Sequence, residues 1–248
     1  MNFSSRILCI LVAALCFWTG TAQANVVIGG TRVVFSASQG ETTLRLSNQG
    51  KQPALVEAWI DEGNLHSTPN NTHAPFLITP PLFRMEAGKD QSLRILFTGQ
   101  TDSLPSDRES LFWLNVLEIP PKPKQAADKN ILQFAVRSRL KLFYRPANLD
   151  GNPLKAPGKL IWKASTDSQG VQLTVHNPTP YYITITKVSL KSGDTQVTAK
   201  SGMVAPFGDQ HIALSDLHHA PAAGTHIAFT TINDYGAADA HEGAIAAQ

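Results

Sequence analysis

The chain has 248 residues, a formal net charge of +2 at pH 7, and 16% charged residues. This near balance gives no reason to expect a nucleic-acid partner, because such binding depends on many Lys and Arg contacts to phosphate. The length suggests one large or two small domains.

Residues 1–24 have the three parts of a secretory signal peptide: the cation Arg6, an apolar run of about a dozen residues, and small residues ending at Ala24. We expect cleavage after Ala24. No later run reaches the roughly 18 apolar residues of a membrane helix, so we expect an exported protein without membrane insertion. Both cysteines, Cys9 and Cys16, lie in this peptide, so the mature chain would form no disulfide.

From Asn25 onward, short apolar or alternating segments are separated by turn residues, which is typical of an all-β sandwich. No amphipathic helix of useful length is predicted. The expected strands of the first half are 31–35, 42–47, 54–61, 76–79, 92–97 and 111–118. Those of the second half are 159–164, 171–176, 182–191, 196–200, 210–214 and 225–232.

A segment rich in Gly, Pro and Asn separates the two halves, and it predicts a domain boundary. The expected organisation is an N-terminal domain over residues 25–146, a linker over 147–158, a C-terminal domain over 159–236 and a flexible tail over 237–248.

Residues 130–146 predict one long strand with two different faces. The even positions are mostly apolar, whereas the odd positions include Arg137, Arg139, Lys141 and Arg145. A half-buried strand of any antiparallel sandwich shows this alternation. Periodicity alone therefore assigns the apolar face to the protein's own core and the basic face to solvent.

Motifs of catalysis are absent from the sequence. It contains no GxSxG elbow, no phosphate-binding glycine loop and no HExxH motif. The adjacent His218 and His219 would point to opposite faces of a strand, and the histidines show no metal-ligand spacing. Asp61 and Glu62 are interpreted as ordinary surface or turn charges. We expect no enzyme, no cofactor and no metal site.

Six separated segments carry a family resemblance: GTRVVF at 30–35, TPPLF at 79–83, SDRESLFW at 106–113, KLFYRP at 141–146, NPTPYY at 177–182 and TINDYG at 231–236. In this order they resemble the periplasmic pilus-assembly chaperones of the chaperone–usher pathway, the PapD/FimC-like family. The resemblance covers essentially the whole mature chain. It implies two immunoglobulin-like β-sandwich domains set at an angle, with an interdomain cleft.

The resemblance also implies roles for single residues. Arg32 and Lys141 would hold the C-terminal carboxylate of a pilus subunit in the cleft, through charge-assisted bonds of roughly 1.5–3 kcal/mol each. The alternating side chains that would fill the groove of a subunit lacking its last strand are Leu132, Phe134 and Val136.

An ion network of Glu109, Arg145 and Asp234 would link the domains, again by resemblance. Two interpretations fit the apolar residues Leu55, Pro81 and Leu82: a patch facing the outer-membrane usher, or packing within a surface loop. The short Pro-rich loop at 120–128 and the lack of cysteine in the mature chain resemble the subgroup with a short loop before the donor strand.

The expected function is therefore that of a periplasmic chaperone, which caps fimbrial subunits by donor-strand complementation and delivers them to an outer-membrane usher. A secreted carbohydrate-binding or adhesin module, or a copper- or zinc-handling protein that uses the histidines, is the alternative. The identity of the subunit and usher, weak self-association of the unloaded chain, and the point within 130–146 at which donor face becomes core stay open.

Overall fold

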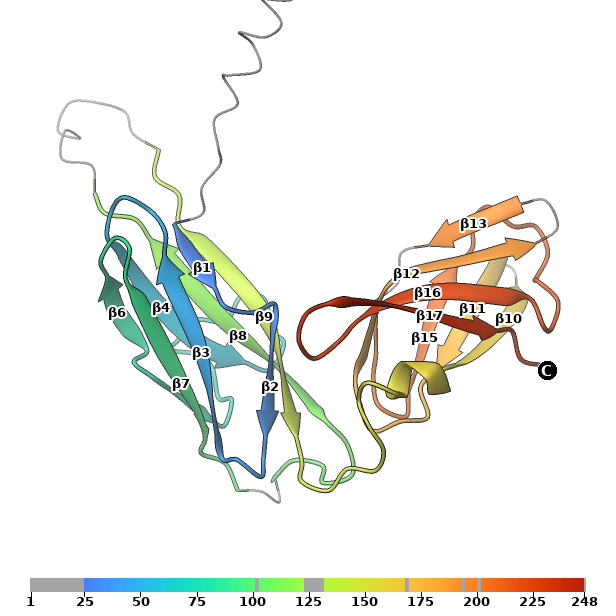
Figure 1. Ribbon diagram of the computed structural model, residues 1–248, viewed down its shortest axis with the longest axis horizontal. Helices are drawn as coiled ribbons and strands as arrows, with labels where there is room; N and C mark the ends of the chain where they lie inside the picture. Colours follow the sequence, from blue (N-terminus) through green and yellow to red (C-terminus); the bar gives the residue numbers. More distant parts are fainter. Residues whose placement is uncertain are drawn as a thin grey trace, which may run out of the picture.

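The computed structural model describes residues 25–100, 103–122, 132–167, 170–192, 195–199 and 202–247. These residues form two β-sandwiches set at an angle to each other (Figure 1). The expectation of two immunoglobulin-like sandwich domains is confirmed. Across the described ranges, no helix has both the length and the apolar character that crossing a membrane requires.

Two sheets make up the first sandwich. The smaller one has the strand order β1 (Val26–Ile28), β3 (Glu41–Asn48), β7 (Asp90–Phe97) and β5 (Phe76–Thr79). The larger one has the order β2 (Arg32–Ser36), β9 (Val136–Arg145), β8 (Ser110–Ile119), β4 (Ala54–Asp61) and β6 (Leu82–Met85). β2 pairs with β9 in parallel, and the other ladders of this sheet are antiparallel.

The core of the first sandwich forms because alternate residues of each strand point between the sheets. Aromatic rings fill the end at which β9 finishes. Phe76 meets Phe35, Phe97 and Phe112 edge-on, with ring centroids 5.4, 5.3 and 4.9 Å apart. Tyr144 of β9 stacks on Phe35 at 5.8 Å. The C-terminal half of β9 is thereby fixed in the core.

The second sandwich is built in the same way. One sheet has the order β10 (Ile161–Asp167), β11 (Gly170–His176) and β15 (Asp209–Ala213). The other has the order β13 (Thr195–Ala199), β12 (Ile183–Ser192), β16 (His226–Ile232) and β17 (Ala238–Ala244), with β14 (Met203–Val204) also paired to β12. A 3-10 turn, η3 (Ala156–Lys159), leads into β10. Trp162 and Phe229 meet in the core with ring centroids 5.1 Å apart.

β9 is shorter than the strand predicted over residues 130–146. Its pairing with β8 begins at Val136, opposite Glu118. Residues 132–135 belong to no strand, while 130 and 131 lie outside the described residues. The prediction is therefore wrong for 132–135, because β8 ends at Ile119 and offers almost no further backbone to pair with.

The apolar positions of β9 share one face but differ in cover. Val136 is 56% exposed, whereas Leu140 is 6% and Leu142 is 0% exposed. The β8–β9 register is constant through this region, so no bulge separates these residues. Instead, a hollow of about 160 Å³ between β1, β8 and β9 lies beside Val136, where the facing sheet ends. Loss of cover from that sheet thus turns a core face into an exposed face.

Residues 238–244 form β17, so the prediction of a flexible tail is wrong for these residues. β17 pairs with β16 along its whole length. The ring of His241 stacks on Phe229 at 5.2 Å, and its Nε2 lies 2.9 Å from the hydroxyl of Thr231. The strand sequence ADAHEGA contains no β-branched residue and no Phe, Tyr or Trp. Backbone pairing and tertiary contact hold this strand, and propensity did not reveal it.

Candidate functional site

Arg32 and Lys141 lie together at the junction of the two domains, on the first rung of the β2–β9 ladder. Each side chain reaches a group of the second domain. Arg32 Nη1 donates to the backbone oxygen of Ile232 at 2.8 Å, and Lys141 Nζ donates to the hydroxyl of Thr184 at 3.1 Å. Figure 1 shows the β16–β17 hairpin reaching toward β2 and β9 at this point. The structure thus places the two predicted anchor residues side by side, each in contact with the second domain.

The two cations are partly desolvated. Burial lowers the pKa of Lys141, and the nearby charge of Arg32 lowers it further. Burial also lowers the pKa of Arg32, against an opposing effect of Asp234. Within the described part of the chain, Arg32 Nε is buried without a hydrogen-bond partner and neither cation forms an ion pair. A carboxylate beside the two cations would relieve their repulsion, so the pair favours an anion.

Phe143 lies on the basic face of β9 but packs against the second domain. Its ring stacks on Tyr182 with centroids 5.6 Å apart, and the guanidinium of Arg32 lies 5.9 Å from its centre. The sequence alone did not predict this contact. The sequence did contain one indication of it. Phe143 is apolar and stands between Lys141 and Arg145, on a face where a polar residue is expected if the face is exposed to solvent. The basic face of β9 is therefore the face turned toward the second domain.

Glu109, Arg145 and Asp234 form a continuous ion network across the domain junction. Arg145 donates from Nε to Glu109 at 2.7 Å and from Nη1 to Asp234 at 2.8 Å. The other oxygen of Glu109 accepts from the backbone N–H of Tyr182 at 2.7 Å. The structure thus places these three predicted residues in direct contact, with links to both domains.

The network is poorly screened by solvent, because the Glu109 side chain is only 1% exposed. Burial raises the pKa of Glu109, against the lowering effect of the Arg145 guanidinium. For Arg145, burial alone would lower the pKa, but the hydrogen bonds and charges of the two carboxylates outweigh it and raise the pKa. Removing one member would leave a buried charge unpaired.

The predicted donor side chains stand in solvent. Leu132 is 77%, Phe134 69% and Val136 56% exposed. No described residue pairs with the second edge of β9 between Val136 and Leu140, because β2 begins only opposite Lys141. An exposed apolar row thus continues into an open backbone edge, and this edge ends at the two cations.

Asp61 is buried, and its interpretation as an ordinary surface charge is wrong. Its side chain is 2% exposed, and it accepts hydrogen bonds from Arg139 at 2.5 Å, Asn115 at 2.7 Å and Ser67 at 2.8 Å. Burial alone would raise the pKa of Asp61, but these bonds, that of Arg139 first, hold the pKa below its ordinary value. Arg137, 3.7 Å from the carboxylate, completes what we call the Asp61 network.

Two tryptophans support the arginines of the Asp61 network. The guanidinium of Arg137 lies 4.9 Å from the ring centre of Trp59, and that of Arg139 lies 4.3 Å from that of Trp113. Arg137 also donates to Asn115 at 2.7 Å. The basic face of β9 is therefore not simply solvated. A sequence signal existed in the alternating Trp59 and Asp61 of β4, but it could be read only with the strand order known.

Leu55 and Leu82 lie on the neighbouring strands β4 and β6 and are 40% and 54% exposed. Pro81 is also exposed, and its backbone oxygen accepts a hydrogen bond from Ala58 at 2.8 Å. Leu55 lines a shallow hollow of about 280 Å³ together with Ile119 and other residues. The three predicted patch residues thus share one edge of the first domain, far along β4 from Asp61.

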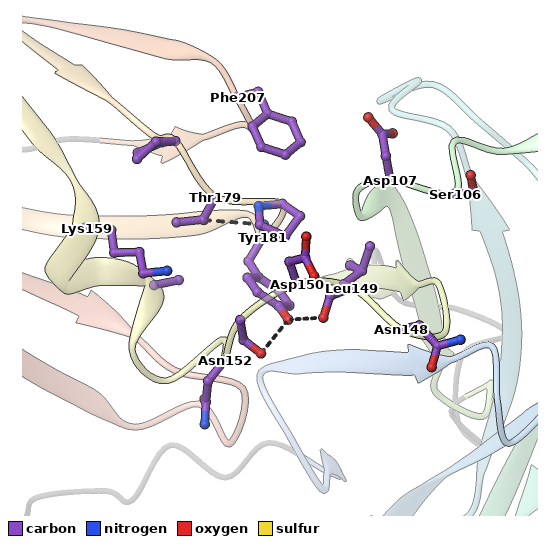
Figure 2. A pocket seen from close by; sticks show the side chains of 14 residues that line it. Ser106, Asp107, Asn148, Leu149, Asp150, Asn152, Lys159, Thr179, Tyr181 and Phe207 are labelled. Atoms are coloured by element: carbon purple, nitrogen blue, oxygen red, sulfur yellow. Dashed lines mark hydrogen bonds between the residues drawn. The ribbon is translucent and has the colours of Figure 1, made fainter.

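A further interdomain cavity, of about 350 Å³, lies beside the linker and contains none of the predicted site residues. Figure 2 shows Asp107 of the first domain and Phe207 of the second on its walls, with Tyr181 next to the linker residues Leu149 and Asp150. The single Tyr181 hydroxyl hydrogen lies between the backbone oxygens of Leu149 and Gly151, which are 3.5 and 3.4 Å from the hydroxyl oxygen. This contact ties the linker to the second domain.

Both halves of the chain match family models of one kind. Residues 25–150 match the model described as pili and flagellar-assembly chaperone, PapD N-terminal domain. Residues 155–243 match the pili assembly chaperone PapD, C-terminal domain. The chain is 44% identical over 227 residues to the chaperone protein FimB/FhaD of Bordetella pertussis, covering 91% of this chain and 90% of that protein.

Solved structures are similar over nearly the same length. The crystal structure of the YadV chaperone gives a TM-score of 0.76 at 38% identity, covering 90% of this chain and 100% of that chain. The structure of the Salmonella enterica SafA pilin in complex with the SafB chaperone gives a TM-score of 0.72 at 31% identity, covering 92% of this chain and 99% of that chain.

Proposed function

The chain belongs to the family of PapD-type pilus-assembly chaperones of the chaperone–usher pathway, and we propose that it caps fimbrial subunits with its own strand β9 and delivers them to an outer-membrane usher. One observation carries this proposal: the exposed apolar row leads into the open edge of β9, and this edge ends at Lys141, where Arg32 of β2 lies beside it. A pilin–chaperone complex is known for a relative at 31% identity.

The cations supply the anchor in this proposal. A subunit's terminal carboxylate would accept charge-assisted bonds from Arg32 and Lys141, two neighbouring cations that form no ion pair among the described residues. Such bonds contribute roughly 1.5–3 kcal/mol each. Thr184 holds Lys141 in place from the second domain. The anchor therefore needs both domains at a fixed angle, which we assign to Glu109, Arg145 and Asp234.

The anchor also fixes the direction of the subunit strand. The C-terminus of the subunit lies at Lys141. The subunit residues that precede it pair with the part of β9 that leads toward Val136 and Leu132. The subunit strand then runs parallel to β9, in line with β2, which pairs with the next part of the same edge in parallel. Since side chains alternate with a period of two, the position of the carboxylate sets the register of the whole contact.

The donor side chains supply the apolar contact. Burial of a large apolar side chain is worth about 1.5–3 kcal/mol, so Leu132, Phe134 and Val136 together give on the order of 5–9 kcal/mol before ordering costs. The borrowed strand covers the subunit's open edge, which would otherwise pair with other subunits. A strand of the next subunit that makes more contacts can then displace β9 without consumption of a nucleotide.

Delivery and compartment complete the proposal. Residues 1–24, outside the described residues, would direct export to the periplasm. The exposed Leu55, Pro81 and Leu82 would face the usher. We assign no catalytic residue and no cofactor to this function.

Co-expression with a fimbrial subunit in a bacterial periplasm tests the proposal. We expect a one-to-one complex, and we expect Arg32→Ala and Lys141→Ala each to abolish it while leaving the chain folded. If both variants retain the subunit as well as the unmodified chain does, the anchor assignment is wrong.

A further inference from the structure

The two sheets of the first sandwich leave a hollow between them at one edge. β1 is the edge strand of the smaller sheet. The part of β9 before Lys141 is the edge of the larger sheet among the described residues, because β2 begins only opposite Lys141. Both edge strands line the hollow of about 160 Å³ described above, and β8 lies behind them. The hollow therefore adjoins the edge with which a subunit strand would pair.

The walls of the hollow are mostly apolar. Val26 and Ile28 line it from β1, Val116 lines it from β8, and Val136 and Ser138 line it from β9. Val116 and Ser138 are directly opposite each other on the β8–β9 ladder. Because the serine side chain is small, it leaves space between the two sheets at this point.

Glu118 is the charged residue of the lining, and the chain itself uses its carboxylate. Oε2 of Glu118 accepts a hydrogen bond from the backbone N–H of Val26 at 3.2 Å, which joins β8 to β1. The remaining space suits an apolar group. Its volume is that of a large side chain, since an apolar cavity of about 150 Å³ can hold a benzene molecule.

A subunit strand paired with β9 would point side chains into this hollow. In the parallel β2–β9 ladder, residues opposite each other point to the same face, as Val33 and Leu142 do, which are both buried. The subunit strand proposed above runs in line with β2. Its residues opposite Val136 and Ser138 would therefore point between the two sheets.

We propose that the hollow receives one large apolar side chain, aromatic or of leucine size, from the last strand of the fimbrial subunit; this rests on the proposed function. The carboxylate held at Lys141 fixes the register, so the same position of each subunit faces the hollow. A charged residue at that position would be buried without a partner. The hollow thus selects subunits by the size and polarity of one residue, and Ser138 determines this specificity by keeping the space open.

The test uses the full chain and a fimbrial subunit that co-purifies with it from a bacterial periplasm. Dissociation of the complex is measured for the unmodified chain and for Ser138→Leu and Ile28→Phe, which fill the hollow from β9 and from β1. Ser92→Leu is the matched control, because Ser92 is exposed on β7. We expect about tenfold faster dissociation for both filling variants, since the subunit side chain no longer fits, and no change for the control.

A complementary change in the subunit makes the test specific. Apolar residues of the subunit's last strand are replaced by alanine, one at a time. At one position, we expect alanine to speed dissociation from the unmodified chain. With the same alanine subunit, Ser138→Leu should restore slow dissociation, because its leucine fills the space that the alanine leaves.

Two results would overturn the inference. If the hollow stays empty in the complex, Ser138→Leu only lengthens the apolar row of β9, and it should then dissociate from the unmodified subunit at the same rate or more slowly. The other is that no alanine position is restored by Ser138→Leu. If free Ser138→Leu fails to unfold cooperatively, Ile28→Phe decides the same question.

Lys141→Ala separates this inference from the proposed function. If Lys141→Ala abolishes the complex while both filling variants dissociate at the unmodified rate, the inference about the hollow is wrong and the proposed function stands. If Lys141→Ala binds the subunit normally, the proposed function itself fails.

Discussion

Arg32 and Lys141 are backbone partners on the first rung of the parallel β2–β9 ladder, so one register places both cations where the open edge of β9 ends. A slip of one residue would turn one of the two side chains to the opposite face of the sheet. The register of the protein's own sheet therefore decides where a bound carboxylate can sit.

The first prediction concerns pH. Burial and the charge of Arg32 lower the pKa of Lys141 from 10.5, so the free protein loses this charge at a lower pH than an ordinary lysine would. Because a carboxylate binds the charged form, subunit affinity should be full below the lowered pKa and fall as pH rises through it. Calorimetric titration of subunit binding from neutral to alkaline pH measures this.

Lys141→Arg is the control for that titration, because an arginine stays charged throughout the range. The variant should retain binding at pH values where the unmodified chain loses it. An identical alkaline loss in both proteins would show that a group other than Lys141 controls binding.

The second prediction concerns the donor row. Phe134 is 69% exposed, so Phe134→Glu should leave the thermal unfolding of the free chain unchanged. The buried carboxylate would be unpaired in a subunit groove, so the variant should fail to protect a subunit from proteolysis. Leu77→Glu, an exposed position on the other sheet, should protect normally. Loss of cooperative unfolding in free Phe134→Glu would instead place Phe134 in the chain's own core.

The third prediction concerns the domain junction. Arg145→Ala leaves Glu109, which is 1% exposed, without its guanidinium partner. Removing one partner of a fully buried pair costs roughly 3–5 kcal/mol, and the cost here should be at or below that range, because the Arg145 side chain is 19% exposed. We expect differential scanning calorimetry to resolve separate unfolding of the two domains. Arg84→Ala breaks an exposed pair with Glu86 within the first domain and should leave the trace almost unchanged. An unchanged calorimetric trace for both variants would show that the ion network does not link the unfolding of the two domains.

The fourth prediction concerns Asp61. Asp61→Asn should lower the free energy of unfolding by about 3 kcal/mol at neutral pH, since Arg139 loses its buried partner. The pKa of Asp61 is lowered in the folded chain, so its contribution is full above the unfolded pKa of about 3.9 and disappears as pH falls through the folded value. Urea unfolding of both proteins at neutral and acidic pH checks the sign. A difference that grows toward acid pH would contradict it.

Strand spacing predicted the two sandwiches well because each strand of a sandwich keeps an inward and an outward face. The prediction failed where a segment forms a strand only if an adjacent strand is present to pair with it. β17 has no strand-forming residues and exists through β16, while residues 132–135 have the strand pattern but no partner strand. Val136 and Leu140 point to the same face of β9. Leu140 is buried because the other sheet covers it, whereas Val136 is exposed because that sheet ends before it.

The candidate site was predicted unevenly for a related reason. The motifs named Arg32, Lys141 and the residues of the ion network, although these lie far apart in the sequence, and the structure brings them together. Local sequence could not show that Asp61 faces Arg137 and Arg139, because this depends on the order β9, β8 and β4 in the sheet. Thr184 and Tyr182 likewise become visible only once the second domain is placed.

The central claim is that the subunit's terminal carboxylate is held by Lys141 and Arg32. A double-mutant cycle tests it most directly, combining Lys141→Ala with a semisynthetic subunit whose C-terminus is an amide. We predict that either change alone weakens the complex by at least tenfold and that the second change then adds almost nothing, because both remove the same interaction. Fully additive losses, or an amidated subunit that binds as tightly as the free acid, would contradict the account.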